Sequence, residues 1–343
     1  MENPVVKQGK RPMSPKRRFL TALLGGQPDR VPVGNVVSVA TMEQMKLANA
    51  WFPLAHSDAD CMARLAAASF ELLGFDTIMP VFSVTQEAEA LGCQVDWGQP
   101  DQMPTVRSHP FAESSEFFLP KNWQEAPSIQ VVLEALRRLR AQYSDRVVIV
   151  GKVMGPWTLS YHLMGLEEFL VSTKLEPERA RRCLEALKVV PVAFARAQIQ
   201  DGADIVCLAD HATGGMVSPL AYRDFLLPLH QEIFGAIGAP TVLHCCGNTT
   251  DRIRYFAQSG VDCYHFESQV DIEPAVADAR GKMTLIGNIN NPTTLLEGTP
   301  EDVIATCQKA IAAGVDILSP ECAVPLTTSL ENLKAMVSAV CMK

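Results

Sequence analysis

The chain has 343 residues, of which 48% are hydrophobic, and it carries a formal net charge of −8 at pH 7 with a pI near 5.4. This acidic balance disfavours nucleic acid and anionic membrane surfaces as partners. No apolar run approaches the ~18 residues that a membrane-spanning helix needs, so we expect no membrane segment.

The N-terminal part is predicted to be a basic tail followed by a helix, together covering residues 1–30. The tail lacks the apolar core and the small-residue cleavage site of a secretory signal. Ten cysteines in a chain of this length, mostly within apolar segments, do not resemble a disulfide framework. We therefore expect a cytoplasmic protein whose cysteines are mostly small buried hydrophobic residues.

Strands and helices are predicted to alternate along most of the chain. The predicted strands lie near residues 30–37, 76–82, 146–153, 204–209, 240–246, 262–266, 283–289 and 315–319. The predicted helices cover residues 15–24, 41–48, 58–73, 128–142, 219–237, 249–259, 272–280, 299–313 and 330–340, with two more after residue 155, the second near 177–202. An irregular, proline-containing stretch over 87–127 predicts a small β excursion after the second strand.

The fold class that fits this pattern is α/β, as a (β/α)₈ TIM barrel in one domain over residues 1–343. Apolar strands without strict alternation indicate a parallel sheet that is buried on both faces. Eight strand–helix units favour a closed barrel over an open doubly wound sheet. A G-x-G-x-x-G motif is absent after the first strand, so dinucleotide binding has no support.

The motif that suggests chemistry is His244-Cys245-Cys246, at the end of the fifth predicted strand. Side chains alternate along a strand, so His244 and Cys246 point to one side and Cys245 to the other. An imidazole and a thiolate are ligands that zinc prefers. Cys322, at the end of the eighth predicted strand, is the best candidate for a third ligand. The alternative is a core histidine beside a buried cysteine.

The barrel fold places these groups together. In such barrels the functional residues lie at the carboxyl ends of the strands. His244 and Cys246 end the fifth strand, Asp210 and His211 follow the fourth, and Glu267 follows the sixth. We therefore expect these side chains and Cys322 to share one rim. Three protein ligands leave one zinc position open, as in catalytic sites.

With these residues placed, the chain resembles the uroporphyrinogen decarboxylase superfamily over nearly its whole length. Within that superfamily it is similar to the zinc-dependent methylcobamide:coenzyme M methyltransferases. The resemblance is carried by Leu23-Leu24-Gly25-Gly26, Glu87–Cys93, Gly155-Pro156-Trp157-Thr158-Leu159, Ala209-Asp210, His244-x-Cys246-Gly247-Asn248, Gly287-Asn288-Ile289, Cys322 and Leu330–Lys334. The decarboxylases lack the zinc triad and carry an arginine-rich N-terminal segment, whereas residues 32–37 contain no arginine here.

The resemblance implies a function and its partners. It implies zinc bound by His244, Cys246 and Cys322, with Glu267 as a fourth ligand that an incoming thiol displaces. It implies methyl transfer from a methyl-Co(III) corrinoid (methylcobalamin type), carried on a small corrinoid-binding protein, to coenzyme M. The chain has no D-x-H-x-x-G motif for binding cobalamin itself, which agrees with delivery by a partner.

Other rim residues receive expectations of their own. Asp210 is expected to orient His244 or a substrate group, or else to cap a loop. Trp157 either stacks on the corrinoid or packs in the core, and packing is favoured. His211 belongs to the same rim, and we place it on the corrinoid side.

Several alternatives stay open. Tetrahydrofolate could replace coenzyme M as methyl acceptor, and a metal-free tetrapyrrole decarboxylase or a non-enzymatic corrinoid-binding protein are further readings. Glu321 beside Cys322 departs from the glycine-rich family pattern, and an extra carboxylate there would disfavour a sulfonate. A homo-oligomer is compatible with the sequence.

Overall fold

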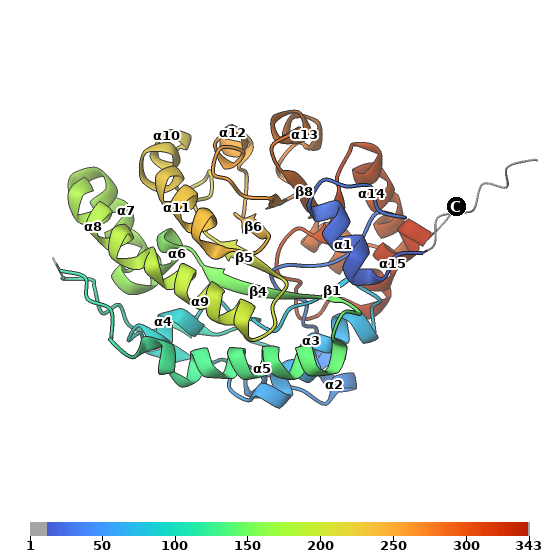
Figure 1. Cartoon of the computed structure of the whole chain (residues 1–343), viewed down its shortest axis with the longest axis horizontal. Coiled ribbons are helices and arrows are strands. Elements are labelled where there is room, and N and C mark those ends of the chain that lie inside the picture. The colour runs from blue at the N-terminus through green and yellow to red at the C-terminus, as the bar shows by residue number, and fades with distance from the viewer. Residues whose placement is uncertain (1–11, 115, 342–343) are drawn as a thin grey trace, which may run out of the picture.

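The structure is a computed structural model that describes residues 12–114 and 116–341. The N-terminal tail over residues 1–11 lies outside the described residues. Seven parallel strands form a curled sheet with helices around its outside (Figure 1). The strands, in sheet order, are β1 (Thr77–Ile78), β4 (Val148–Met154), β5 (Ile205–Ala209), β6 (Thr241–His244), β7 (Cys263–Phe266), β8 (Thr284–Ile289) and β9 (Ile317–Pro320).

The strand predicted at 30–37 is reduced to a short bridge that closes the barrel. Val33 pairs in parallel with Leu318 of β9, and on its other side the Val33 carbonyl accepts a hydrogen bond from the Asp76 N–H. The segment is short because Pro32 has no N–H to donate and because the Val33 N–H goes to the Asp76 carboxylate. The predicted (β/α)₈ architecture is therefore confirmed as a barrel-like fold, with a bridge in place of one strand.

The four helices predicted before β4 are present, together with three short helical elements that were not predicted. They are α1 (Pro15–Leu23), α2 (Met42–Ala48), η1 (Leu54–His56), α3 (Ala59–Glu71), α4 (Gln86–Ala90), η2 (Trp123–Glu125) and α5 (Pro127–Tyr143). The excursion is an antiparallel pair of two-residue strands, β2 (Val95–Asp96) and β3 (Thr105–Val106). It begins within α4, a short helix that the alternating pattern did not reveal.

Four helices follow β4 where two were predicted. They are α6 (Pro156–Met164), α7 (Leu166–Leu175), α8 (Pro177–Leu187) and α9 (Val189–Gln200). Gly165, with a φ of 88°, separates the first two. Pro191 has no N–H for the carbonyl of Leu187, so the helix predicted near 177–202 divides into two.

The remaining helices alternate with the strands as predicted, although some are shorter or interrupted. They are α10 (Pro219–Ala221), the π-helical turn η3 (Tyr222–Leu226), α11 (Leu227–Ile237), η4 (Thr250–Arg252), α12 (Ile253–Phe256), α13 (Ile272–Ala279), the π-helical turn η5 (Asn291–Leu296), α14 (Pro300–Ala312) and α15 (Leu330–Cys341). None of the helices in the described ranges is long and apolar enough to cross a membrane.

Candidate metal centre

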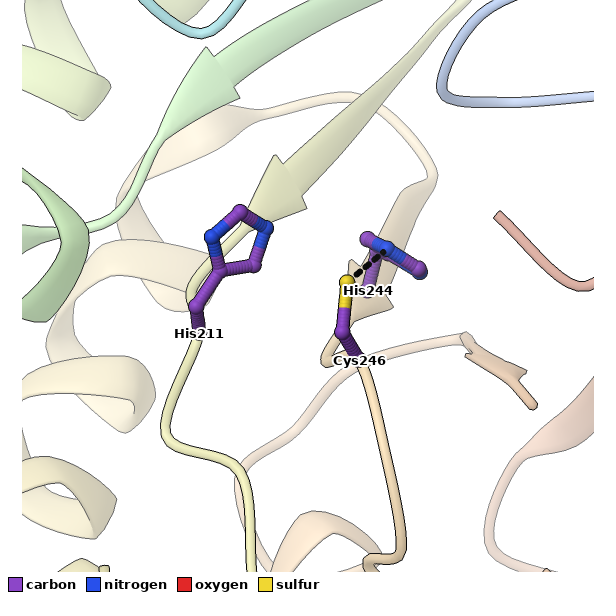
Figure 2. Close-up of side chains that lie close together, drawn as sticks. All are labelled: His211, His244 and Cys246. Atoms are coloured by element: carbon purple, nitrogen blue, oxygen red, sulfur yellow. Dashed lines mark hydrogen bonds between the residues drawn. The ribbon is translucent and has the colours of Figure 1, made fainter. Parts of the chain in front are cut away.

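The ends of β6 and β9 bring one imidazole and two thiols together. His244 is the last residue of β6, Cys246 follows two residues later, and Cys322 follows the end of β9. The His244 Nε2 lies 3.1 Å from the Cys246 Sγ and 3.6 Å from the Cys322 Sγ. The two sulfur atoms are 3.6 Å apart. Figure 2 shows His244 and Cys246 facing each other, with His211 beside them.

This triangle has the dimensions that a tetrahedral zinc requires. Zn–S bonds of about 2.3 Å and Zn–N bonds of about 2.0–2.1 Å place two sulfur ligands about 3.8 Å apart and a nitrogen and a sulfur about 3.6 Å apart. Two of the observed separations are 3.6 Å, and the third, at 3.1 Å, needs only a small opening. The donor set and its spacing therefore fit zinc.

Two further side chains reach this triangle. A carboxylate oxygen of Glu267 lies within 4.8 Å of the Cys246 and Cys322 sulfur atoms, and a ring nitrogen of His211 lies within the same limit of His244 and Cys246. The His211 and His244 rings are 6.1 Å apart and nearly perpendicular. Glu267 and His211 are thus the two candidates for a fourth position.

Burial and hydrogen bonds set the protonation states of the three side chains of the triangle. Burial holds the pKa of His244 well below its usual value, so its imidazole is neutral and able to donate a lone pair. A hydrogen bond from the Cys246 thiol lowers the pKa of Cys322, and the same bond raises that of Cys246. The thiol pair therefore holds one proton more firmly than the other. Burial also raises the pKa of Glu267.

Cys245 has the opposite orientation, as strand alternation predicts. It is buried, and its thiol donates to the Cys246 carbonyl at 3.9 Å. Burial raises the pKa of its thiol far above the usual range. Cys245 is therefore a small core residue and not a ligand.

Comparison with known proteins identifies the family. Residues 14–341 match the uroporphyrinogen decarboxylase (URO-D) family, which is nearly the whole chain. The chain belongs to the uroporphyrinogen decarboxylase family. In this family it is 36% identical over 328 residues to a methylated-thiol–coenzyme M methyltransferase of Methanosarcina mazei, covering 95% of this chain and 89% of that protein.

Two other relatives point to the same branch of the family. A methylcobamide:CoM methyltransferase of Methanosarcina barkeri is 31% identical over 327 residues, covering 94% of this chain and 96% of the relative. A solved structure of a methyltransferase from Methanosarcina mazei superposes with a TM-score of 0.93 at 30% identity, covering 95% of this chain and 98% of that one. The barrel fold is therefore that of a methyltransferase in this family.

The Asp210 side chain makes its hydrogen bonds away from the triangle, although its backbone N–H donates to the His244 carbonyl at 2.9 Å. Its carboxylate accepts hydrogen bonds from the N–H groups of Trp157 and Thr158, at 3.4 and 2.7 Å, and so caps the start of α6. It also bonds the His230 Nε2 at 3.0 Å. Neither oxygen of Asp210 bonds the His244 ring among the described residues. These contacts describe the capping alternative and not a residue that orients His244.

Trp157 packs in the core. Its side chain is 1% exposed and meets the rings of Tyr161, Phe169 and Phe225 edge-on. A ring so enclosed is in the packing arrangement that the sequence favoured over stacking on a corrinoid.

His211 keeps its position on the rim. Its backbone N–H donates to the Thr158 hydroxyl at 2.8 Å, and its carbonyl accepts from the Tyr161 hydroxyl. Burial lowers the pKa of its imidazole. The ring therefore stands neutral beside the triangle, next to His244 rather than on an outer surface.

The Glu321 carboxylate is occupied by neighbouring loops. It accepts hydrogen bonds from the N–H of Ser268 at 2.9 Å, from the N–H of Asn291 at 2.8 Å and from the Asn290 side chain at 3.2 Å. These donors compensate its charge, which weakens the argument that Glu321 repels an anionic acceptor. Its charge still contributes to the raised pKa of Glu267.

Two charged residues inside the barrel were missed by the sequence reasoning. Lys152 lies two residues before the carboxyl end of β4, and Glu87 lies in α4 with its Oε1 accepting the Met154 N–H at 2.8 Å. Both are almost fully buried. Burial raises the pKa of Glu87 to about 7 and lowers that of Lys152 to about 8. Lys152 could have been noticed in the sequence, because it is the single charged residue within the apolar run Val147–Met154.

Proposed function

We propose that this protein is a zinc-dependent methyltransferase that moves a methyl group from a methylated corrinoid to the thiol of coenzyme M. The observation that supports it is the 3.1–3.6 Å triangle of His244, Cys246 and Cys322 at the carboxyl rim of the barrel. The names of the relatives supply the chemistry, since they are methyltransferases that act on coenzyme M.

The three side chains would hold zinc and set its charge. When bound, zinc supplies a Lewis acid that binds the acceptor sulfur as a thiolate. A free thiol with a pKa near ~8.5 is mostly protonated at neutral pH, and only the thiolate is a competent nucleophile. Two protein thiolates and a neutral imidazole balance the charge of the ion, so the acceptor sulfur keeps the electron density that it needs for attack.

The ligand side chains would then leave one position on zinc for the acceptor sulfur. Cys246 and Cys322 occupy two ligand positions with sulfur, and His244 occupies one with nitrogen. Glu267 lies near both sulfur atoms and would fill the fourth position until the acceptor displaces it.

The transfer balances without a further reactant. The acceptor sulfur forms a bond to the methyl carbon, and the carbon–cobalt bond breaks with both electrons remaining on cobalt. The thiol proton leaves to solvent, and the corrinoid, which is a substrate here, departs as Co(I). We propose that a small corrinoid-binding protein brings it to the carboxyl rim, because a corrinoid is too large to enter the barrel.

Coenzyme M is favoured over tetrahydrofolate as acceptor. The relatives described above carry coenzyme M in their names. The acceptor atom of coenzyme M is a sulfur, which is a ligand that zinc prefers, whereas the acceptor atom of tetrahydrofolate is a nitrogen that does not need activation as a thiolate. Tetrahydrofolate therefore serves as the comparison substrate in the test.

The test is direct. Purified protein with one equivalent of zinc is mixed with methylcobalamin and either coenzyme M or tetrahydrofolate, and the Co(I) spectrum is followed without oxygen. The proposal expects methyl-coenzyme M and Co(I) in equal amounts, and neither product with tetrahydrofolate. Methylation of tetrahydrofolate alone, or no zinc-dependent reaction, would contradict it.

A further inference from the structure

Lys152 places a buried ammonium inside the barrel, close to the rim. It lies in β4, whose seven residues are all buried, in register with Cys207 of β5. Its Nζ donates to the Val37 carbonyl at 3.1 Å, and this is its one hydrogen bond within the part of the chain that the structure describes. An ammonium has three N–H donors. Two of them therefore have no protein partner there.

The loop that holds the ammonium also holds a residue of the triangle. Asn35 accepts the Val37 N–H at 2.8 Å and donates its side-chain N–H to the Cys322 carbonyl at 3.2 Å. The Lys152 charge is also among the causes that lower the pKa of Cys322 and of His244. A chain of hydrogen bonds through Val37 and Asn35 thus connects the Lys152 ammonium to the backbone of Cys322.

Other buried polar atoms around Lys152 lack hydrogen-bond partners. The Glu87 Oε2 and both ring nitrogens of His56 are buried without a hydrogen bond in the described residues. The His56 ring stacks on Phe52 at 4.1 Å, and burial together with the Lys152 charge lowers its pKa to about 3. A neutral His56 can donate one N–H to an anion. Lys152, Glu87 and His56 therefore each have a buried polar atom that could bind a polar ligand.

The protein alone does not balance the Lys152 charge. In the described chain no carboxylate lies within 4.0 Å of its Nζ, and Glu87, with a pKa of about 7, is ionised only about half of the time near neutral pH. The proposed zinc site offers no surplus negative charge, because its two thiolates balance the ion. A buried charge without a partner is strongly unfavourable.

We propose that Lys152 binds the anionic end of the thiol acceptor and so selects an acidic thiol over a neutral one. This inference rests on the proposed function, in which the triangle holds the sulfur at the other end of the same small molecule. Coenzyme M, a thiol joined to a sulfonate by two carbons, has both groups. Lys152 is then a specificity-determining residue for the acceptor.

A different role for Lys152 gives a different result. If the lysine only adjusted the charge of the thiolates, replacing it would change the reaction of every thiol alike. If it binds the anionic end, the loss falls on acidic thiols. The comparison therefore uses 2-mercaptoethanesulfonate and 2-mercaptoethanol, which share the thiol and differ in the anionic group.

The first experiment measures kcat/KM for both thiols with methylcobalamin. Lys152→Met keeps the length of the side chain and removes the charge, and Cys207→Ala perturbs the neighbouring position of the barrel without changing charge. Lys152→Met is expected to lower the ratio of the sulfonate to the neutral thiol roughly 10- to 100-fold, as loss of a charged hydrogen bond does. The ratio is expected to stay within about threefold in Cys207→Ala. An equal loss for both thiols in Lys152→Met would overturn the inference.

The second experiment needs neither zinc nor turnover. Ethanesulfonate has no thiol, so its binding to zinc-free protein reports on the anionic end alone. It is expected to raise the melting temperature of the wild type and of Cys207→Ala by an amount that grows with the logarithm of its concentration above Kd, and to leave Lys152→Met unchanged. Equal stabilisation of all three proteins would contradict the inference. Replacing a buried charge with an apolar side chain is often neutral or stabilising, and Lys152→Gln provides a second variant should Lys152→Met not fold.

The two proposals fail separately. If the wild type methylates neither thiol, the proposed function is wrong. If the wild type methylates both and the Lys152 variants keep the wild-type ratio, the function stands and the role of Lys152 is wrong.

Discussion

Cys246 and Cys322 are 76 residues apart in sequence, and their sulfur atoms lie 3.6 Å apart. One sulfur follows β6 and the other follows β9, and the curvature of the barrel joins them. Each thiol is also within 3.6 Å of the His244 Nε2. Predictions about metal content and catalysis follow from this pair.

Replacing Cys322 by serine should remove zinc. The exchange deletes one of two sulfur ligands, and we expect zinc affinity to fall by more than the 10–100-fold that loss of a supporting partner costs. Metal analysis after dialysis against a weak chelator measures it. Cys245→Ser is the matched control, since its sulfur points into the core, and it should retain zinc. Equal zinc contents in the two variants would contradict the assignment of Cys322.

The fourth position is decided by comparing Glu267→Gln with His211→Asn. If Glu267 is displaced by the acceptor, Glu267→Gln should weaken zinc binding by about tenfold and lower the KM for coenzyme M, because the thiol no longer competes with a carboxylate. Chelator competition and steady-state kinetics measure the two effects. His211→Asn should leave zinc affinity within about threefold of the wild type. The reverse outcome would assign the position to His211.

Asp210 should matter for stability more than for zinc. Asp210→Ala removes the cap of α6 and the partner of His230, and we expect the free energy of unfolding to fall by about 1–3 kcal/mol. Denaturant unfolding measures it, and Asp278→Ala, at an exposed position, should change it by less than about 0.5 kcal/mol. A variant that is stable but has lost its zinc would restore the idea that Asp210 acts on the metal site.

Glu87 should make the protein less stable as pH rises from 4.5 to 7. Its pKa is raised from 4.5 to about 7 in the folded state, so in this window the folded protein binds a proton that the unfolded chain has released. Its contribution is fully present below pH 4.5 and is lost through pH 7, with a size of up to about 3 kcal/mol. Unfolding of Glu87→Gln at several pH values should lack this slope, whereas Glu331→Gln, at an exposed position, should keep it. A slope that persists in Glu87→Gln would show that other groups cause it.

The metal ligands could be predicted from the sequence because strand alternation and barrel topology each allow one arrangement. Alternation along a strand placed His244 and Cys246 on one side and Cys245 on the other, and the distances agree. Barrel topology then brought Cys322 to them, because parallel strands present their carboxyl ends at one rim. These two rules recovered the triangle without knowledge of its distances.

Other features depend on tertiary contacts that no local pattern shows. The strand at 30–37 looked regular, but the Asp76 carboxylate takes the Val33 N–H and shortens it. Trp157 stood near the rim in sequence, yet three rings enclose it. Lys152 is a single charge in an apolar run, and only the structure shows that its ammonium turns into the barrel toward Val37.

X-ray absorption at the zinc edge would measure the ligands of the bound ion. We expect two sulfur atoms at about 2.3 Å and nitrogen or oxygen ligands at about 2.0–2.1 Å in the resting protein, and a third sulfur after coenzyme M is added. A zinc shell without sulfur, or one that is unchanged by coenzyme M, would contradict this expectation.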